Sequence, residues 1–197
     1  MIIRNIWLSL PEDNQMFFIM NLKFYNYDQC LNHYTKRIDT IKQARIKGEL
    51  ILAKPILLLA IIDCIDEKHI CQNCINIDET LELKYYSLIR KYTKGTQFDN
   101  PTKIEYPFWH LQSDGFWHLS GIEQPKKMNK SVTKKFLEEQ VKHAYFDNDL
   151  WILLNNEVTR IALRNYIIDT KLGKESPNKG FFKKISCYLP LLWQIAG

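Results

Sequence analysis

Residues 54–66, KPILLLAIIDCID, are the stretch that decides the fold of this chain. Every position from 56 to 62 is apolar, and the proline costs nothing at a helix start, because the first helical N–H has no intrahelical partner. The stretch therefore predicts a strongly apolar helix that opens at Lys54-Pro55. Asp63 stops the apolar run far below the ~20 residues that a membrane helix needs, so we expect no membrane partner.

Helices are also predicted on both sides of this stretch. Before it, apolar residues recur at three- and four-residue steps over residues 12–50, and Gly48 is the expected stop. After it, a short linker leads to an amphipathic helix from about Asp78, whose side chain suits the N-cap position. Further along, we expect Asp147 to cap one helix and a second helix to cover residues 157–172.

Residues 106–119, YPFWHLQSDGFWHL, differ in character from the helical segments. Two aromatic pieces, PFWHL and GFWHL, flank a Gln-Ser-Asp-Gly turn, and Asp-Gly between apolar runs is a strong hairpin signal. Helix, linker, helix and hairpin in this order are typical of a winged-helix module. The predicted fold class is α+β, mostly helical: a winged-helix-like helix pair plus an aromatic β-hairpin, with N- and C-terminal helices.

The composition is that of a globular chain with a real core. The 197 residues are 46% hydrophobic and 13% aromatic, which excludes wholesale disorder. The seven glycines do not form the spacings of dinucleotide-binding or P-loop motifs, so phosphate-cradling loops of those kinds are excluded. Five cysteines, an odd number, and no credible signal peptide favour reduced thiols in a cytoplasmic protein. The net charge of +5 is compatible with a nucleic-acid partner but does not require one.

The residue pattern supports neither a zinc site nor a hydrolytic centre. Cys71 and Cys74 have zinc-ligand spacing and His69 lies just before them, but no second pair of ligands completes a tetrahedral site. A metal-dependent nuclease needs clustered acids or a histidine base beside a metal, whereas the acidic residues here stand where solvated helix faces put their charges. We therefore expect no enzyme activity, no cofactor and no metal, with a metal-dependent nuclease as one alternative.

Basic residues bracket the aromatic block. Lys54 precedes it, Lys103 lies beside it, and several lysines, including Lys142, and then His143 follow it. Lysines interleaved with aromatic residues suit contacts with a phosphate backbone next to an apolar recognition pocket. The competing interpretation is a helical regulatory or scaffolding module, in which the aromatic residues are buried and the chain binds a protein partner.

Four blocks of the sequence, in this order, resemble a known family. They are KPILLLAIID, ELKYYSLIRKY, EYPFWHLQSDGFWHL and YFDNDLWILLNNEVTRIALRNYII, and they extend over about residues 50 to 172. They resemble the N-terminal domain of modification-dependent HNH restriction endonucleases, which includes sulfur-binding domains that recognise phosphorothioated DNA. The Tyr-Pro-Phe…Asp-Gly-Phe-Trp block is the strongest element of this resemblance.

The resemblance implies roles for individual residues. In the phosphorothioate readers, the Tyr-Pro step forms an apolar pocket that receives the sulfur, and a small residue three positions after the proline completes it. In this chain Tyr106 and Pro107 are then the pocket walls, and His110 stands at the small position. Basic residues before the proline of the first helix and after the hairpin hold phosphates, which implies Lys54, Lys142 and His143.

Two positions depart from the family pattern. His110 is bulky where the readers usually have a small side chain, and Ala53 stands where a basic residue or histidine is common. An imidazole at position 110 either fills the pocket or makes a different, polar contact.

The sequence and the resemblance together predict three segments and a function. The segments are a helical extension, residues 1–49, a DNA-recognition domain, residues 50–172, and a basic and apolar tail, residues 173–197, that packs on the domain. The predicted function is a non-catalytic module that recognises double-stranded, phosphorothioated DNA for a restriction or related defence system. The HNH catalytic half is missing, so the chain either recruits a separate nuclease subunit or is a fragment of a longer nuclease.

Overall fold

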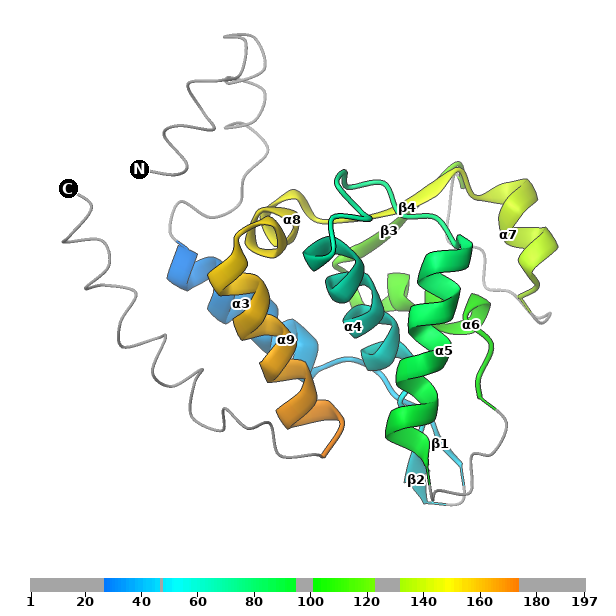
Figure 1. The fold of residues 1–197 in the computed structure, drawn as a ribbon, viewed down its shortest axis with the longest axis horizontal. Helices are drawn as coiled ribbons and strands as arrows, with labels where there is room; N and C mark the ends of the chain where they lie inside the picture. The colour runs from blue at the N-terminus through cyan, green and yellow to red at the C-terminus, as the bar shows by residue number, and fades with distance from the viewer. Residues whose placement is uncertain (1–26, 47, 95–100, 123–131, 174–197) are drawn as a thin grey trace, which may run out of the picture.

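The computed structural model describes residues 27–46, 48–94, 101–122 and 132–173 (Figure 1). Its fold is α+β and mostly helical, which confirms the predicted class. In the described ranges, the sheets are two small antiparallel pairs of strands. Residues 12–26 of the first predicted helix and residues 174–197 of the predicted tail lie outside the described residues.

The elements are mainly helices, with short strands between them. In chain order they are α3 (Tyr27–Asp39), β1 (Arg45–Ile46), β2 (Glu49–Leu50), α4 (Ala53–Asp66), α5 (Glu79–Thr93), α6 (Glu105–His110), the 3-10 helix η1 (Leu111–Asp114), β3 (Trp117–Ser120), α7 (Lys134–Gln140), β4 (His143–Phe146), α8 (Asn148–Asn155) and α9 (Glu157–Lys171).

Helix α4 is the centre of the hydrophobic core. Eleven of its 14 residues are buried, and it packs against α5, α6, α8 and α9; Figure 1 shows it between α9 and α5. Pro55 lies in the first turn, where it removes no intrahelical hydrogen bond. Although α4 is strongly apolar, no helix in the described part of the chain is long and apolar enough to cross a membrane.

The starts of α5 and α9 follow the sequence signals. Asp78 is the N-cap of α5, and its carboxylate accepts a hydrogen bond from the backbone N–H of Leu81 at 2.8 Å. Asn156 caps α9 in the same way through the backbone N–H of Thr159 at 3.2 Å. Each cap satisfies a backbone donor that has no partner within the helix. The helices predicted from Asp78 and over residues 157–172 are confirmed.

The helix predicted over residues 12–50 is wrong after Asp39. Helix α3 ends at Asp39, and β1 and β2 form a small antiparallel pair with Arg45 opposite Leu50. Burial stops at Ile41, and the residues that follow are largely exposed, so a longer helix would have no apolar face to bury. Gly48, the predicted stop, instead lies between the two strands with a φ of +87°, a conformation that suits glycine.

The predicted aromatic hairpin is wrong in its first strand. Residues 105–110 form α6, and η1 continues from it. Pro107, Phe108 and Trp109 are all buried, which a helix packed into a core allows and a strand with one solvent face does not. Gly115 has the positive φ that the Asp-Gly signal predicts, +80°, but there it ends η1.

The second aromatic piece is a strand, as predicted, with a different partner. Strand β3 pairs antiparallel with β4, and Trp117 lies opposite Phe146. These two rings pack at 5.0 Å between centroids and face the core. The sheet therefore joins two segments that α7 separates along the chain, instead of closing a tight turn.

Helix α3 packs against α8 and α9 and belongs to the same core. The hydroxyl of Tyr34, a fully buried residue, donates to the Asp147 carboxylate at 3.0 Å, and His118 Nε2 lies 2.6 Å from the other oxygen of Asp147. Asp147 is the N-cap residue of α8, as predicted, but its side chain makes no cap hydrogen bond and links α3 to β3 instead.

The division of the chain into three segments, residues 1–49, 50–172 and 173–197, stays a prediction.

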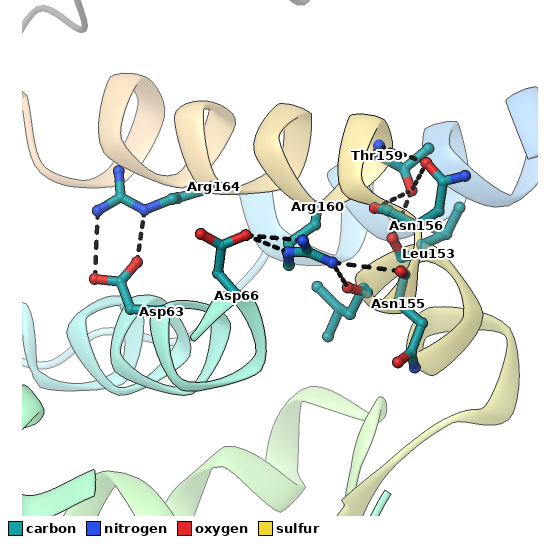
Figure 2. A network of polar contacts seen from close by, with 9 residues as sticks. Asp63, Asp66, Leu153, Asn155, Asn156, Thr159, Arg160 and Arg164 are labelled. Carbon is teal, nitrogen blue, oxygen red and sulfur yellow. Dashed lines mark hydrogen bonds and ion pairs between the residues drawn. The ribbon is translucent and has the colours of Figure 1, made fainter. Parts of the chain in front are cut away.

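Two arginines of α9 join this helix to α4 (Figure 2). Arg164 makes two hydrogen bonds to the Asp63 carboxylate, at 2.6 and 3.3 Å. Arg160 pairs with Asp66 at 2.8 Å and also donates to the backbone carbonyl of Leu154 at the end of α8 at 2.9 Å. The network therefore fixes α4, α8 and α9 relative to one another.

We expect Asp63→Asn to lower the free energy of unfolding by about 1–2 kcal/mol, because it leaves the half-buried guanidinium of Arg164 without its counter-charge. Urea denaturation of both proteins measures the difference. The matched control is Glu139→Gln, which breaks the exposed Lys135–Glu139 pair and should cost less than about 0.5 kcal/mol. Equal losses in the two variants would contradict a stabilising role for the Asp63–Arg164 pair.

Candidate nucleic-acid interface

Helix α6 carries the aromatic residues of the predicted DNA-binding site, and the core fixes its position. Phe108 packs edge to face against Trp117 of β3 at 5.3 Å between ring centroids. The indole N–H of Trp117 also donates to the backbone carbonyl of Phe108 at 2.9 Å. Pro107, one of the two predicted pocket walls, is buried in the first turn of α6. These contacts hold one side of α6 against the sheet.

Tyr106 and His110 form an aromatic surface on α6. They are four residues apart and so share one face of the helix. Their rings are stacked, with centroids 6.3 Å apart and planes inclined by 21°. Tyr106 is half-buried and His110 is exposed, so both are accessible from solvent. The structure thus brings these two predicted site residues together.

Lys54 reaches the same region from the first turn of α4. Its ammonium lies 2.7 Å from one oxygen of Asp114 and 3.2 Å from the hydroxyl of Ser113. The Asp114 side chain is only 2% exposed, and its other oxygen accepts the backbone N–H of Lys42 at 3.0 Å. Charge-assisted hydrogen bonds of this kind are strong, so a buried carboxylate holds the Lys54 ammonium at η1.

The pKa of His110 lies below its ordinary value. Partial burial of the ring is the larger cause, and the positive charge of Lys54 is the second. Both disfavour the imidazolium form, since one removes water from the charge and the other repels it. At neutral pH, His110 therefore presents an uncharged ring beside Tyr106, and Lys54 carries the positive charge.

The remaining predicted site residues lie on other segments. Lys103 is exposed in the segment that leads into α6, and its carbonyl accepts the backbone N–H of Tyr106 at 3.2 Å. Lys142 is exposed just before β4, and His143 is the first residue of that strand. The His143 ring lies 6.0 Å from that of Tyr145, on a different element from Tyr106 and His110.

Sequence reasoning missed two features of this region. Asp114 was predicted only as a turn residue, whereas it is the buried partner of Lys54. Arg37 of α3 lies against Gly115, with its guanidinium 3.4 Å from where a Cβ of that residue would stand. The Asp-Gly pair signalled a turn correctly, but no local signal connects it to a helix so distant in sequence. Ala53, where the family often has a basic residue, is buried at the start of α4.

In the part of the chain that the structure describes, the cysteine pair has no metal-site geometry around it. Cys71 and Cys74 are exposed, and the Cys71 thiol donates to the carbonyl of Lys68 at 3.0 Å. His69 Nε2 lies 2.9 Å from the Asp78 carboxylate, which is also the cap of α5. Within the described ranges, no group of three or more His, Cys, Asp or Glu side chains is placed to hold a metal ion.

Comparison with known families agrees with the resemblance in the sequence. A family model described as the ScoMcrA-like DNA sulfur-binding domain matches residues 32–179, well over half of the chain. The match includes α4, α6 and η1, and it begins within α3. No curated protein matches the chain.

The electrostatic coupling between His110 and Lys54 can be measured by an NMR titration of the imidazole. We expect a His110 pKa below 6.5 that rises in Lys54→Gln, because this variant removes a repelling positive charge. The pKa of His110 should fall further in Asp114→Asn, because the positive charge of Lys54 is then no longer balanced by a carboxylate. Lys135→Gln, which removes an exposed charge on α7, is the control and should leave the pKa of His110 unchanged. An unchanged His110 titration in Lys54→Gln would refute the coupling.

Proposed function

Because the chain belongs to the ScoMcrA-like DNA sulfur-binding domain family and is thus a DNA-binding module, we propose that it recognises phosphorothioate linkages in double-stranded DNA. It does so as a non-catalytic part of a restriction or related defence system. The observation that carries the proposal is the aromatic surface of Tyr106 and His110 on α6, with the ammonium of Lys54 held next to it.

The chemistry of the linkage fits such a surface. Sulfur in place of a non-bridging oxygen is larger, softer and less strongly hydrated. An ordinary phosphate oxygen loses more hydration when it contacts an apolar ring, so two uncharged rings favour sulfur over oxygen. Tyr106 and His110 supply those rings, and the buried Pro107 fixes the first turn of α6 behind them.

Lys54 supplies the charge that any backbone linkage needs. A lysine ammonium has three N–H donors. Asp114 and Ser113 take two of them, which leaves one for a phosphate oxygen. Because the carboxylate holds the ammonium in place, the contact requires little further ordering of a long side chain. Lys103, Lys142 and His143 are assigned to backbone phosphates farther along the duplex.

Cleavage is assigned to a nuclease outside the present chain, either a separate subunit or the rest of a longer protein. The alternative, a metal-dependent nuclease within this chain, has a direct test. Supercoiled plasmid incubated with the protein and Mg²⁺ or Mn²⁺ should stay intact. A nicking activity that co-purifies with the protein would establish the alternative.

The central test is a competition between two duplexes that are identical except for one phosphorothioate linkage. The modified duplex should compete better by about tenfold to a hundredfold, as for other single-group apolar contacts of about 1–3 kcal/mol. Tyr106→Ala should reduce this preference selectively. Tyr145→Ala, which removes an exposed ring on β4, is the matched control and should leave the ratio unchanged. No binding of either duplex at low salt would favour the scaffolding alternative.

The preference for sulfur should depend on pH through His110. As the pH falls through the His110 pKa, which lies below 6.5, the ring gains a charge that attracts an unmodified phosphate oxygen, so the preference should narrow. His110→Ala should remove this dependence and leave overall affinity within about tenfold, because most affinity comes from distributed basic contacts. Fluorescence anisotropy with both duplexes, at pH values above and below the His110 pKa, measures the preference for sulfur. A narrowing that persists in folded His110→Ala protein would exclude His110 as its source.

A further inference from the structure

Three segments of the chain meet at the end of η1. Lys54 of α4 reaches it with its ammonium, the segment after α3 with the backbone N–H of Lys42, and α3 with the guanidinium of Arg37. Asp114 binds the Lys54 ammonium and the Lys42 backbone N–H, so both of its oxygens are occupied. The guanidinium of Arg37 lies near Gly115, the next residue, 3.4 Å from where its Cβ would stand.

Arg37 differs from the other described arginines because its guanidinium has no partner among the described residues. Arg160 and Arg164 pair with carboxylates of α4, while Arg45 and Arg90 donate to backbone carbonyls. Arg37 is exposed and lies against the backbone of Gly115. The positive φ of Gly115 suits glycine, and the guanidinium of Arg37 lies at about van der Waals distance from where a Cβ of this residue would stand.

We propose that Arg37 is a second contact for a DNA backbone phosphate, next to Lys54, and that α3 is therefore part of the DNA interface. This inference rests on the proposed function and extends it to a segment predicted as a helical extension. A guanidinium presents a planar fork of donors that matches phosphate geometry, and its charge here is not neutralised by a described neighbour. Lys54 and Arg37 stand beside adjacent residues, Asp114 and Gly115, so at the end of η1 the Arg37 charge lies next to the Lys54–Asp114 ion pair.

The test is the salt dependence of DNA binding in Arg37→Gln. Loss of one phosphate contact should lower the slope of log affinity against log salt by about one unit and weaken binding by about fivefold at moderate salt. Both changes should be equal for plain and phosphorothioated duplexes, because Arg37 reads the phosphate charge and not the sulfur. Arg37→Lys retains the charge and should retain the slope.

The matched control is Lys36→Gln, which removes the same charge from the next residue of α3. Lys36 is also exposed, but successive helical residues point about 100° apart, so its variant should keep the wild-type slope. Thermal unfolding of each variant checks that the fold is intact. Equal slopes in Arg37→Gln and Lys36→Gln, or a lowered slope in Arg37→Lys, would overturn the proposal. A wild-type protein that binds both duplexes equally would instead refute the sulfur preference while leaving the Arg37 test intact.

Discussion

The burial of α4 is the constraint on which the rest of the structure depends. A helix that is apolar on all sides must be covered on all sides, and α5, α6, α8 and α9 provide that cover. Each fully buried Leu or Ile contributes about 1.5–3 kcal/mol, so the core tolerates little displacement of these neighbours. The polar residues of α4 remain partly accessible: Lys54 in the first turn binds η1, and Asp63 in the last turns binds α9. One helix thus holds both the core and a cation of the interface.

Asp114 connects this core to the surface. A buried carboxylate is costly unless it is paired and hydrogen-bonded, and here Lys54 and the backbone of Lys42 satisfy both oxygens. Folding therefore orders the Lys54 side chain before any ligand arrives, which lowers the entropy lost on binding. Partial burial of the ring, and to a lesser extent this ammonium, lower the pKa of the His110 imidazole, so an uncharged ring lies near the Lys54 charge.

Local signals in the sequence predicted the parts of the fold that local physics determines. The apolar run of α4 and the cap at Asp78 are examples, because both depend on residues within a turn or two. The first aromatic piece was predicted as a strand since its turn signal is real, but burial of Phe108 and Trp109 together required a helix. For the candidate site, the resemblance pointed to Tyr106, His110 and Lys54, and the structure places these residues in one region. Their contacts with DNA stay predictions. Arg37 could not be found, because only the tertiary fold brings α3 to Gly115.

Because α3 is anchored by Asp147, which lies far along the chain, the time at which α3 can dock depends on the order of synthesis. The hydrogen bond from Tyr34 to Asp147 joins residues 113 positions apart, whereas α4 and α5 follow each other directly in the chain. Contacts between distant residues carry a larger loop-closure entropy, so we expect the α4–α5 pair to form early and α3 to dock late. On the ribosome, α3 emerges before every other described helix, yet its partners α8 and α9 emerge after all the others. For most of translation, a nascent chain therefore contains Arg37 and Lys54 without the packing that brings α3 to the end of η1.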